Sequence, residues 1–325
     1  MNQHTSSNGV QLNKKLVEAG GVWTAEDLLT EGCCPLCSSE EHYTVVTRQD
    51  GLPIQECTSC GLAYVNPRPS SRQLAEYYGN GYFSGARDFF KGKDYCLERD
   101  KAIAEHTVTG YEDVASNLVI EGKVILDVGC ASGALLQALS KHSPKELIGV
   151  DTAECPVEFG KSKYHLDLRC ETLESARFPD QYFDLVTLID VIEHIEDLRA
   201  FVSELGRVAK PGGHVFVSTP NYFAYRLAKN EWSCLHQDFE HLQYFSPESL
   251  SRLFGKPGFE IGKCWQDSLP FRIREYPSLR RYRAHQVIHP GTALMNGWLK
   301  MKFRLLGNSG HDGLIMKAIV CVPAS

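Results

Sequence analysis

The stretch VILDVGCASGALL, residues 124–136, decides the fold that we predict for this chain. An apolar strand carries Asp127 near its end, a turn follows between Gly129 and Gly133, and an apolar helix then begins. Glycines in such a turn let the backbone approach a ligand closely, and the helix N-terminus offers free N–H groups. The spacing G-x-x-x-G behind an acid differs from the G-x-G-x-x-G of nicotinamide enzymes. An acid at this strand tip suits a cationic ligand.

From residue 123 onward, short apolar runs alternate with helical stretches. Strands are expected at 124–129, 147–151, 166–170, 183–190 and 214–220, with helices at 135–140, 153–163 and 198–209. Such alternation predicts βαβ units and a parallel sheet, and therefore an α/β fold. Two later strands, at 259–266 and 313–322, would complete a seven-stranded sheet. The segment 267–312 between them is predicted to form a helical cap insertion.

These features resemble class I S-adenosylmethionine-dependent methyltransferases, which have a Rossmann-like seven-stranded sheet. The resemblance implies that Asp151 binds both ribose hydroxyls of the cofactor and that residues 171–173 contact its adenine. Ala131 departs from the family pattern, because many members have a second glycine there. The cofactor-binding residues implied are Asp127, Gly129, Cys130, Gly133, Asp151, Thr152, Glu171, Thr172, Leu173 and Asp190.

Two C-x-x-C pairs precede this domain. Cys34 and Cys37 are separated from Cys57 and Cys60 by 19 residues, which is the spacing of a zinc ribbon. Four thiolates complete a tetrahedral Zn²⁺ site, so the metal would be structural, and its binding would stabilise a module too short to have its own core. A redox pair is the competing interpretation. Cys33 could replace Cys34, but Cys34 gives the two-residue spacing.

Acidic and histidine residues follow the fourth strand and return later in LHQDFEHLQYF (235–245). Asp190, Glu193 and His194 should lie at the carboxyl edge of the sheet, where α/β folds bind ligands. Glu240 and His241 come from the later segment. Methyl transfer from a sulfonium needs an aligned acceptor, and an alcohol acceptor also needs a base or a metal to remove its proton. We therefore take His194, His241, Glu240 and Glu193 as the candidate catalytic residues.

Three interpretations of these residues remain open. Metal-dependent O-methyltransferases of ubiquinone biosynthesis and of small-RNA 3′ ends use an acid-x-x-Glu-His group and a later histidine. Asp190, Glu193, His194 and His241 match that layout and could hold a second divalent metal. Sugar C-methyltransferases with a zinc module have a Glu-His followed by an aromatic pair, which Glu240, His241, Tyr244 and Phe245 match. The third interpretation is that these side chains only cap helices and make structural hydrogen bonds.

Length and composition set the domain organisation. The 325 residues suit one full domain with smaller additions, and the 43% hydrophobic and 23% charged fractions are typical of soluble proteins. We expect a flexible tail at 1–30, a zinc-ribbon module at 31–66, a helical lead-in at 67–122 and the methyltransferase domain at 123–325. The sequence shows neither a membrane-spanning run nor a signal peptide, which predicts a cytoplasmic protein with reduced thiols.

Charge is unevenly distributed along the chain. The net charge of −6 argues against a nucleic-acid partner, yet residues 270–306 contain eight cations and one acid. If this basic segment covers the carboxyl edge of the sheet, it favours an anionic acceptor. Candidate clamps are Arg272, Arg274, Arg280, Arg281 and Arg283.

The sequence therefore predicts an S-adenosylmethionine-dependent methyltransferase that acts on a small-molecule acceptor. The acceptor group would be a hydroxyl of a sugar, a sugar-nucleotide or a secondary metabolite, because residues 60–83 also resemble the N-terminal region of bacterial methyltransferases of that type. One alternative is a sugar C-methyltransferase. An alternative of another class is a nucleic-acid-binding adaptor that uses the zinc ribbon and has a vestigial cofactor loop. The oligomeric state cannot be read from the sequence.

Overall fold

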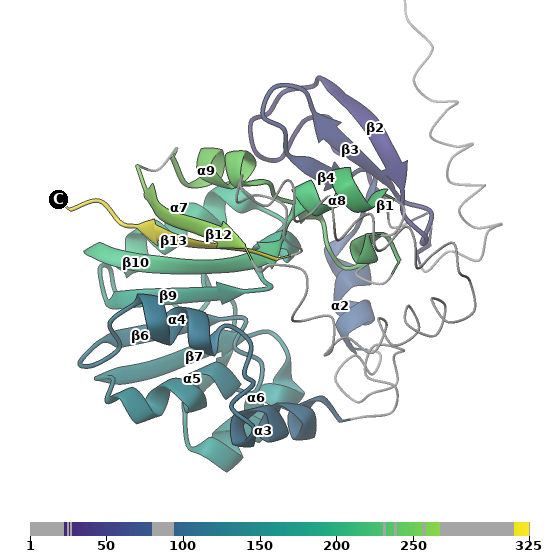
Figure 1. The fold of residues 1–325 in the computed structure, drawn as a ribbon. Coiled ribbons are helices and arrows are strands. Elements are labelled where there is room, and N and C mark those ends of the chain that lie inside the picture. Colours follow the sequence, from purple (N-terminus) through teal and green to yellow (C-terminus); the bar gives the residue numbers. More distant parts are fainter. Residues whose placement is uncertain are drawn as a thin grey trace, which may run out of the picture.

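The computed structural model describes residues 23–79, 94–229, 232–255, 258–266 and 315–324, except residues 25, 27, 237 and 238. Within these ranges a seven-stranded sheet has helices on both faces, and a four-stranded sheet lies beyond one end of it (Figure 1). The predicted cap insertion 267–312 lies outside the described residues, and so do the arginines that were candidate anion clamps.

The large sheet has the strand order β12-β13-β10-β9-β6-β7-β8. Strands β8, β7, β6, β9 and β10 are parallel, whereas β13 is antiparallel to both of its neighbours. This arrangement confirms the predicted α/β fold with a seven-stranded sheet. The strands are β6 (Val124–Val128), β7 (Glu146–Asp151), β8 (Asp167–Cys170), β9 (Phe183–Ile189), β10 (Ala209–Pro220), β12 (Glu260–Gln266) and β13 (Ile315–Cys321).

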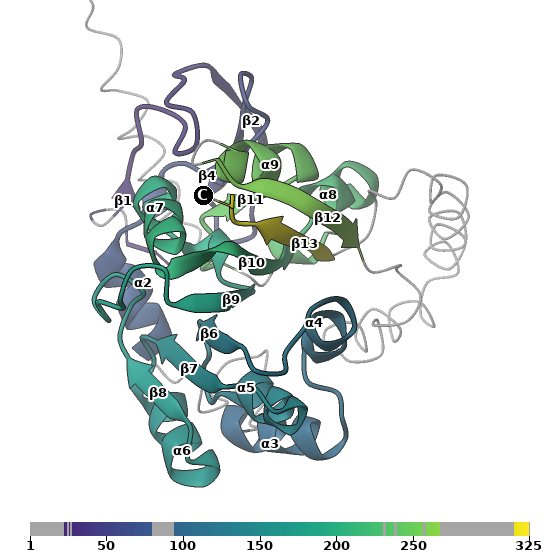
Figure 2. The ribbon, with the colours of Figure 1, turned by 90° about the vertical axis from the view of Figure 1, so that its left-hand side faces the viewer.

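Helices pack against both faces of this sheet, and Figure 2 shows α7 on one side of the strands and α4 on the other. No helix in the described ranges is long and apolar enough to cross a membrane. The helices are α2 (Ser71–Gly79), α3 (Tyr95–Ala104), α4 (Tyr111–Asn117), α5 (Ala134–Leu139), α6 (Glu154–Tyr164), α7 (Leu198–Val208), α8 (Tyr222–Ala228) and α9 (Pro247–Gly255).

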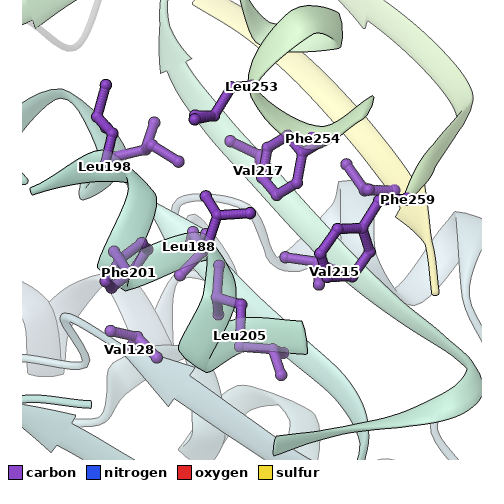
Figure 3. Close-up of a cluster of buried hydrophobic side chains, with 14 of the residues drawn as sticks. Val128, Leu188, Leu198, Phe201, Leu205, Val215, Val217, Leu253, Phe254 and Phe259 are labelled. Carbon is purple, nitrogen blue, oxygen red and sulfur yellow. The ribbon is translucent and has the colours of Figure 1, made fainter. Parts of the chain in front are cut away.

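The central strand β6 is buried along its whole length. Because successive side chains of a strand point to opposite faces, Leu126 and Val128 join the core formed by α7 and α9, whereas Ile125 joins the core formed by α4 and α5. Figure 3 shows Val128 in the first of these cores, together with Leu188 and Leu205. A strand covered on both faces is apolar at nearly every position, which explains the continuous run at 124–128.

The N-terminal region forms a second sheet, with the order β11-β4-β3-β2. Strands β2 (His42–Thr47), β3 (Pro53–Cys57) and β4 (Ala63–Val65) come from the cysteine-rich module. The fourth strand, β11 (Gln243–Tyr244), comes from the chain segment between α8 and α9 and pairs antiparallel with β4. Backbone hydrogen bonds therefore join the cysteine-rich module to the chain segment between α8 and α9.

The described part of the predicted tail 1–30 differs from the expectation. Trp23 is 5% exposed, and its indole Nε1 donates a 2.7 Å hydrogen bond to Asp50. Strand β1 (Leu28–Leu29) pairs antiparallel with β5 (Arg68–Pro69). Trp23 is held in place because an aromatic side chain gains free energy by burial when its N–H also finds a buried acceptor.

Candidate active site

The glycine-rich loop after β6 adopts the backbone that its sequence requires. Gly129 and Gly133 have positive φ angles of 74° and 73°, which only glycine adopts without strain. A Cβ on Gly129 would lie 2.4 Å from the side chain of Val191. The loop therefore packs directly against the turn that follows β9.

Asp127 lies beneath this loop and is 4% exposed. Thr187 on β9 donates a 2.6 Å hydrogen bond to it. Burial raises the pKa of Asp127 to about 7, and the nearby charge of Asp151 acts in the same direction. The carboxyl is thus close to half protonated at neutral pH, and a bound cation would favour its charged form.

Asp151 ends β7 at the same edge of the sheet. Its two carboxylate oxygens accept 2.8 Å hydrogen bonds from the backbone N–H groups of Ala131 and Ala153. Burial raises the pKa of Asp151 despite these hydrogen bonds. The second acid therefore contacts the glycine-rich loop, and the alanine that departs from the family pattern supplies one of its donors.

The remaining predicted cofactor contacts differ in exposure. Thr152, Glu171 and Thr172 are exposed, whereas Cys130 and Leu173 are buried. Thr172 closes a turn, because its Oγ1 accepts a 3.1 Å hydrogen bond from the N–H of Ser175. The exposed members follow β7 and β8, so they lie at the same carboxyl edge as the loop.

The turn after β9 carries the first part of an acid–histidine cluster, which consists of Glu193, His194 and His241. Their ligand atoms lie within 4.8 Å of one another, and the two imidazole rings are 4.7 Å apart between centroids. Glu193 is fully buried and accepts a 2.9 Å hydrogen bond from Thr219. Asp190 follows β9 with a positive φ of 54° and is not a member of the cluster.

The protonation of His194 follows from its neighbours. Its Nδ1 lies 3.0 Å from the hydroxyl of Tyr78 and 3.4 Å from the backbone oxygen of Glu240. Because a carbonyl oxygen only accepts, this contact favours a proton on Nδ1 and leaves Nε2 with the lone pair. Burial lowers the pKa of His194, although the charge of Glu240 opposes the shift.

Burial also lowers the pKa of His241, and His194 and Arg48 act in the same direction. Both rings are therefore available as a base or as metal ligands at neutral pH.

Tyr78 contacts His194, and the sequence did not indicate that it belongs to the site. The sequence places it on α2 with Leu74 and Tyr77, which are both buried, so it reads as one more packing residue. Only the packing of α2 against the turn after β9 brings its hydroxyl to His194. No local sequence signal marks such a contact.

The other residues of segment 235–245 have different surroundings. His236 is exposed, whereas Glu240 is 5% exposed. The hydroxyl of Tyr244 accepts a 3.1 Å hydrogen bond from Arg48, and the backbone oxygen of Phe245 accepts one from the N–H of Tyr222. The aromatic pair is therefore part of the packed core. Asp238 lies outside the described residues.

The cysteine cluster consists of Cys34, Cys37, Cys57 and Cys60. Two Sγ–Sγ distances are 3.5 Å, and all four sulfur atoms lie within 4.8 Å of one another. Sulfur ligands at about 2.3 Å from a tetrahedral zinc ion are separated by roughly 3.8 Å, whereas a disulfide requires about 2.05 Å. The hydrogen bond between the two thiols lowers the pKa of Cys34 and raises the pKa of Cys60. The donor set thus fits Zn²⁺, and Cys33 is not among the four.

Comparison with known proteins supports the fold. Residues 109–263 match the family described as "Methyltransferase domain". This stretch is therefore similar to methyltransferase domains. A Haloferax volcanii structure, described as a complex between a methyltransferase activator and a methyltransferase, aligns with a TM-score of 0.52 at 17% identity over 74% of this chain and 98% of that one. At such low identity it shows the fold alone.

Two curated relatives are similar to part of this chain. The ubiquinone biosynthesis O-methyltransferase of Coxiella burnetii is 31% identical over 113 residues, which cover 33% of this chain and 48% of the relative. The mitochondrial protein of the same name from Dictyostelium discoideum is 30% identical over 141 residues, which cover 38% and 44%. The alignments therefore span less than half of the length of these relatives.

Proposed function

We propose that this protein is an S-adenosylmethionine-dependent methyltransferase that transfers the methyl group to a hydroxyl of a small molecule. One observation carries the proposal: the acidic glycine-rich loop and the acid–histidine cluster occupy the same carboxyl edge of one sheet. The loop follows β6, and Glu193 and His194 follow the adjacent strand β9, whereas His241 comes from the segment between α8 and α9. The loop also packs against the turn that carries Glu193, because the space beside Gly129 is filled by Val191, two residues before that acid.

The cofactor would supply an activated methyl group on a positively charged sulfur. Asp127 offers a buried carboxylate that a cation would keep ionised, and Asp151 offers the carboxylate for the ribose hydroxyls. Either His194 or His241 would accept the proton of the acceptor hydroxyl, because their lowered pKa values keep them neutral. Glu193, in a fixed hydrogen bond to Thr219, would orient the acceptor or a histidine.

A divalent metal is the alternative means of activating the hydroxyl. Glu193, His194 and His241 form a group of one carboxylate and two imidazoles, a donor set that suits several divalent ions. Zn²⁺ would be held separately, by the four cysteines, with a structural role.

The curated relatives act on oxygen according to their names, which favours O-methylation over C-methylation here. The aromatic pair that suggested a sugar C-methyltransferase is packed away from solvent, and Tyr244 is hydrogen-bonded to Arg48. That pair therefore supports the loop rather than lining a site. The adaptor alternative is disfavoured because Asp127, Asp151 and both loop glycines are in place. A sugar, a sugar-nucleotide or a secondary metabolite remains our proposed acceptor class.

Substitution of Asp151 tests the cofactor site. Each charge-assisted hydrogen bond that is lost should cost about 1.5–3 kcal/mol, which weakens binding by roughly tenfold to a hundredfold. Calorimetric titration of S-adenosylmethionine into wild type and Asp151→Ala measures this effect. Asp167→Ala is the matched control, because this acid is exposed and forms an ion pair with Arg169 across 2.9 Å. Equal affinity of wild type and Asp151→Ala would overturn the assignment.

A further inference from the structure

Arg48 lies in the turn between β2 and β3 of the cysteine-rich module, and its side chain reaches the loop that carries His241. We infer that Arg48 is a positioning residue, which holds His241 against His194 and Glu193 from within that module. The inference rests on the proposed function for what His241 does, but not for how His241 is held. By this inference, the N-terminal module helps to form the proposed active site.

Every N–H of the Arg48 guanidinium has an acceptor. Nε and Nη2 donate to the two carboxylate oxygens of Asp50, at 3.1 and 2.6 Å. Nη1 donates to the backbone oxygen of His241 at 2.8 Å and to the hydroxyl of Tyr244 at 3.1 Å. The second hydrogen of Nη2 is directed to the backbone oxygen of Phe239 at 3.0 Å. A guanidinium has five donors in a rigid plane, so five acceptors fix it in one orientation.

The network is buried as well as complete. The side chains of Arg48 and Asp50 have no exposed surface. Asp50 also accepts hydrogen bonds from the indole N–H of Trp23 and the backbone N–H of Leu52. Water cannot replace a lost partner inside such a network, and a fully satisfied buried network enforces a single geometry.

Backbone hydrogen bonds hold the loop on both sides of His241. The backbone oxygen of Leu242 accepts a 2.8 Å hydrogen bond from Val65 of β4, and the N–H of Leu242 donates to the backbone oxygen of Glu193 at 2.9 Å. Arg48 holds the preceding carbonyl, that of His241 itself. The loop is thus fixed between the cysteine-rich module and the turn that carries the other two cluster residues.

The ring of His241 has little else to orient it. Its Nδ1 is buried and has no hydrogen-bond partner in the part of the chain that the structure describes. Its ring neighbours are His194 at 4.7 Å and Tyr244 at 6.0 Å between centroids. Because no side-chain hydrogen bond sets the ring, its place in the cluster depends on the position of its backbone. Arg48 holds the carbonyl of that backbone, and the hydrogen bonds of Leu242 hold the residue that follows.

Hydrogen–deuterium exchange on the full-length protein, with wild type, Arg48→Gln and Arg48→Lys, tests the inference. Lysine keeps the charge beside Asp50 but has no planar fork, so it cannot hold Asp50 and two carbonyls together. We expect the amides of residues 239–245 to exchange roughly tenfold faster or more in Arg48→Gln and by an intermediate factor in Arg48→Lys, with β6 and β9 unchanged. Arg252→Gln is the matched control, because Arg252 also joins the two regions, through a 3.3 Å hydrogen bond to Ser59, without touching the loop.

A second measurement separates positioning from general support. The ¹³Cε1–¹H signal of His241, identified by its loss in His241→Gln, should shift or broaden in both Arg48 variants and stay in place in Arg252→Gln. Zinc content by elemental analysis should be equal in all of these proteins.

If Arg48→Gln does not fold, Arg48→Lys and Tyr244→Phe carry the test. Tyr244→Phe removes one acceptor of the guanidinium. An unchanged His241 signal with unchanged exchange at 239–245 would overturn the inference. Failure of wild type to bind S-adenosylmethionine would instead overturn the proposed function.

Discussion

The two donor clusters of this protein differ in what they leave open. The cysteine cluster offers four like ligands, which would complete a tetrahedron around one ion. The acid–histidine cluster offers one carboxylate and two imidazoles, so a metal there would keep positions free for an acceptor oxygen. The first lies in a short module of strands and turns, and the second lies at the end of a sheet whose core is complete without it. A metal with all positions filled by protein ligands suits a structural role, whereas a metal with open positions suits catalysis.

Loss of a cysteine ligand should have the largest effect. Cys57→Ser should reduce zinc from about one ion per chain to none and lower the free energy of unfolding by roughly 4 kcal/mol or more, because metal binding is the folding energy of such modules. Elemental analysis and denaturant unfolding measure both quantities. Cys33→Ser should leave them unchanged, since this neighbour lies outside the cluster. A folded, metal-free wild type would contradict a structural zinc site.

Loss of a residue from the acid–histidine cluster should affect chemistry and spare folding. His241→Ala should lower the rate of methyl transfer by roughly 10²–10⁴-fold, while cofactor affinity and thermal stability change little. Transfer of a labelled methyl group from S-adenosylmethionine to a panel of phenolic and sugar hydroxyls measures the rate. His236→Ala, an exposed histidine in the same segment, is the control. Loss of activity on chelation, restored by a divalent ion, would favour the metal over the histidine base.

Asp127, the buried acid beneath the glycine-rich loop, differs from both clusters. Its partner would be a cationic ligand rather than a metal. Asp127 has a pKa of about 7, so its carboxyl is protonated below that pH and binding of a cation should release the proton. Cofactor affinity should therefore rise with pH up to about 7 and then level off. Calorimetry in buffers of different ionisation enthalpy detects the released proton. Asp127→Asn should bind more weakly and show no such release.

The raised pKa of Asp127 also makes the stability of the unliganded protein depend on pH, and this contribution falls as the pH rises. Since the folded state holds the proton of Asp127 to a higher pH than the unfolded state does, its contribution to stability is present at low pH. It is lost as pH rises from the ordinary aspartate value through about 7. Urea unfolding of wild type and Asp127→Asn across this range checks the sign. A flat difference between the two proteins would show that the carboxyl is not buried in solution.

The smallest effect is expected from the basic segment 270–306, which lies outside the described residues. If it recognises an anionic acceptor, Arg272→Ala and Arg274→Ala should raise the acceptor KM a few-fold, and added salt should do the same in wild type. Steady-state kinetics at two ionic strengths measures both effects. Unchanged KM under all of these conditions would leave the segment without a role in acceptor binding.

The sequence predicts the large sheet well, because parallel strands buried on both faces are continuous apolar runs. Each expected strand from residue 124 onward is present, and β6 and β7 begin within one residue of the expected positions. The acid–histidine cluster is predicted in part. Glu193, His194 and His241 come together, whereas Asp190, whose φ is positive, is not a member of the cluster. Backbone conformation in a turn of this kind is set by tertiary packing and leaves no periodic signal.

The contacts between the cysteine-rich module and the rest of the chain were not predictable. Arg48 and His241 are 193 residues apart in the sequence, and neither local pattern indicates the other. A buried arginine looks like any surface arginine in a sequence, because burial depends on partners that only the fold supplies. The same holds for Trp23, which reads as part of a polar tail until Asp50 is seen beside it.

The shared four-stranded sheet has a consequence for how the chain can be divided. Strand β4 lies between β3 and β11, so removing residues 31–66 would strip β11 of its partner. It would also uncover Trp232, Tyr222 and Tyr244, which pack against Ile54 in one core. An unpaired strand beside an uncovered aromatic surface promotes aggregation. The junction at residues 66–67 therefore separates two sequence motifs but not two autonomous folding units, and heating should melt both sheets in a single cooperative transition.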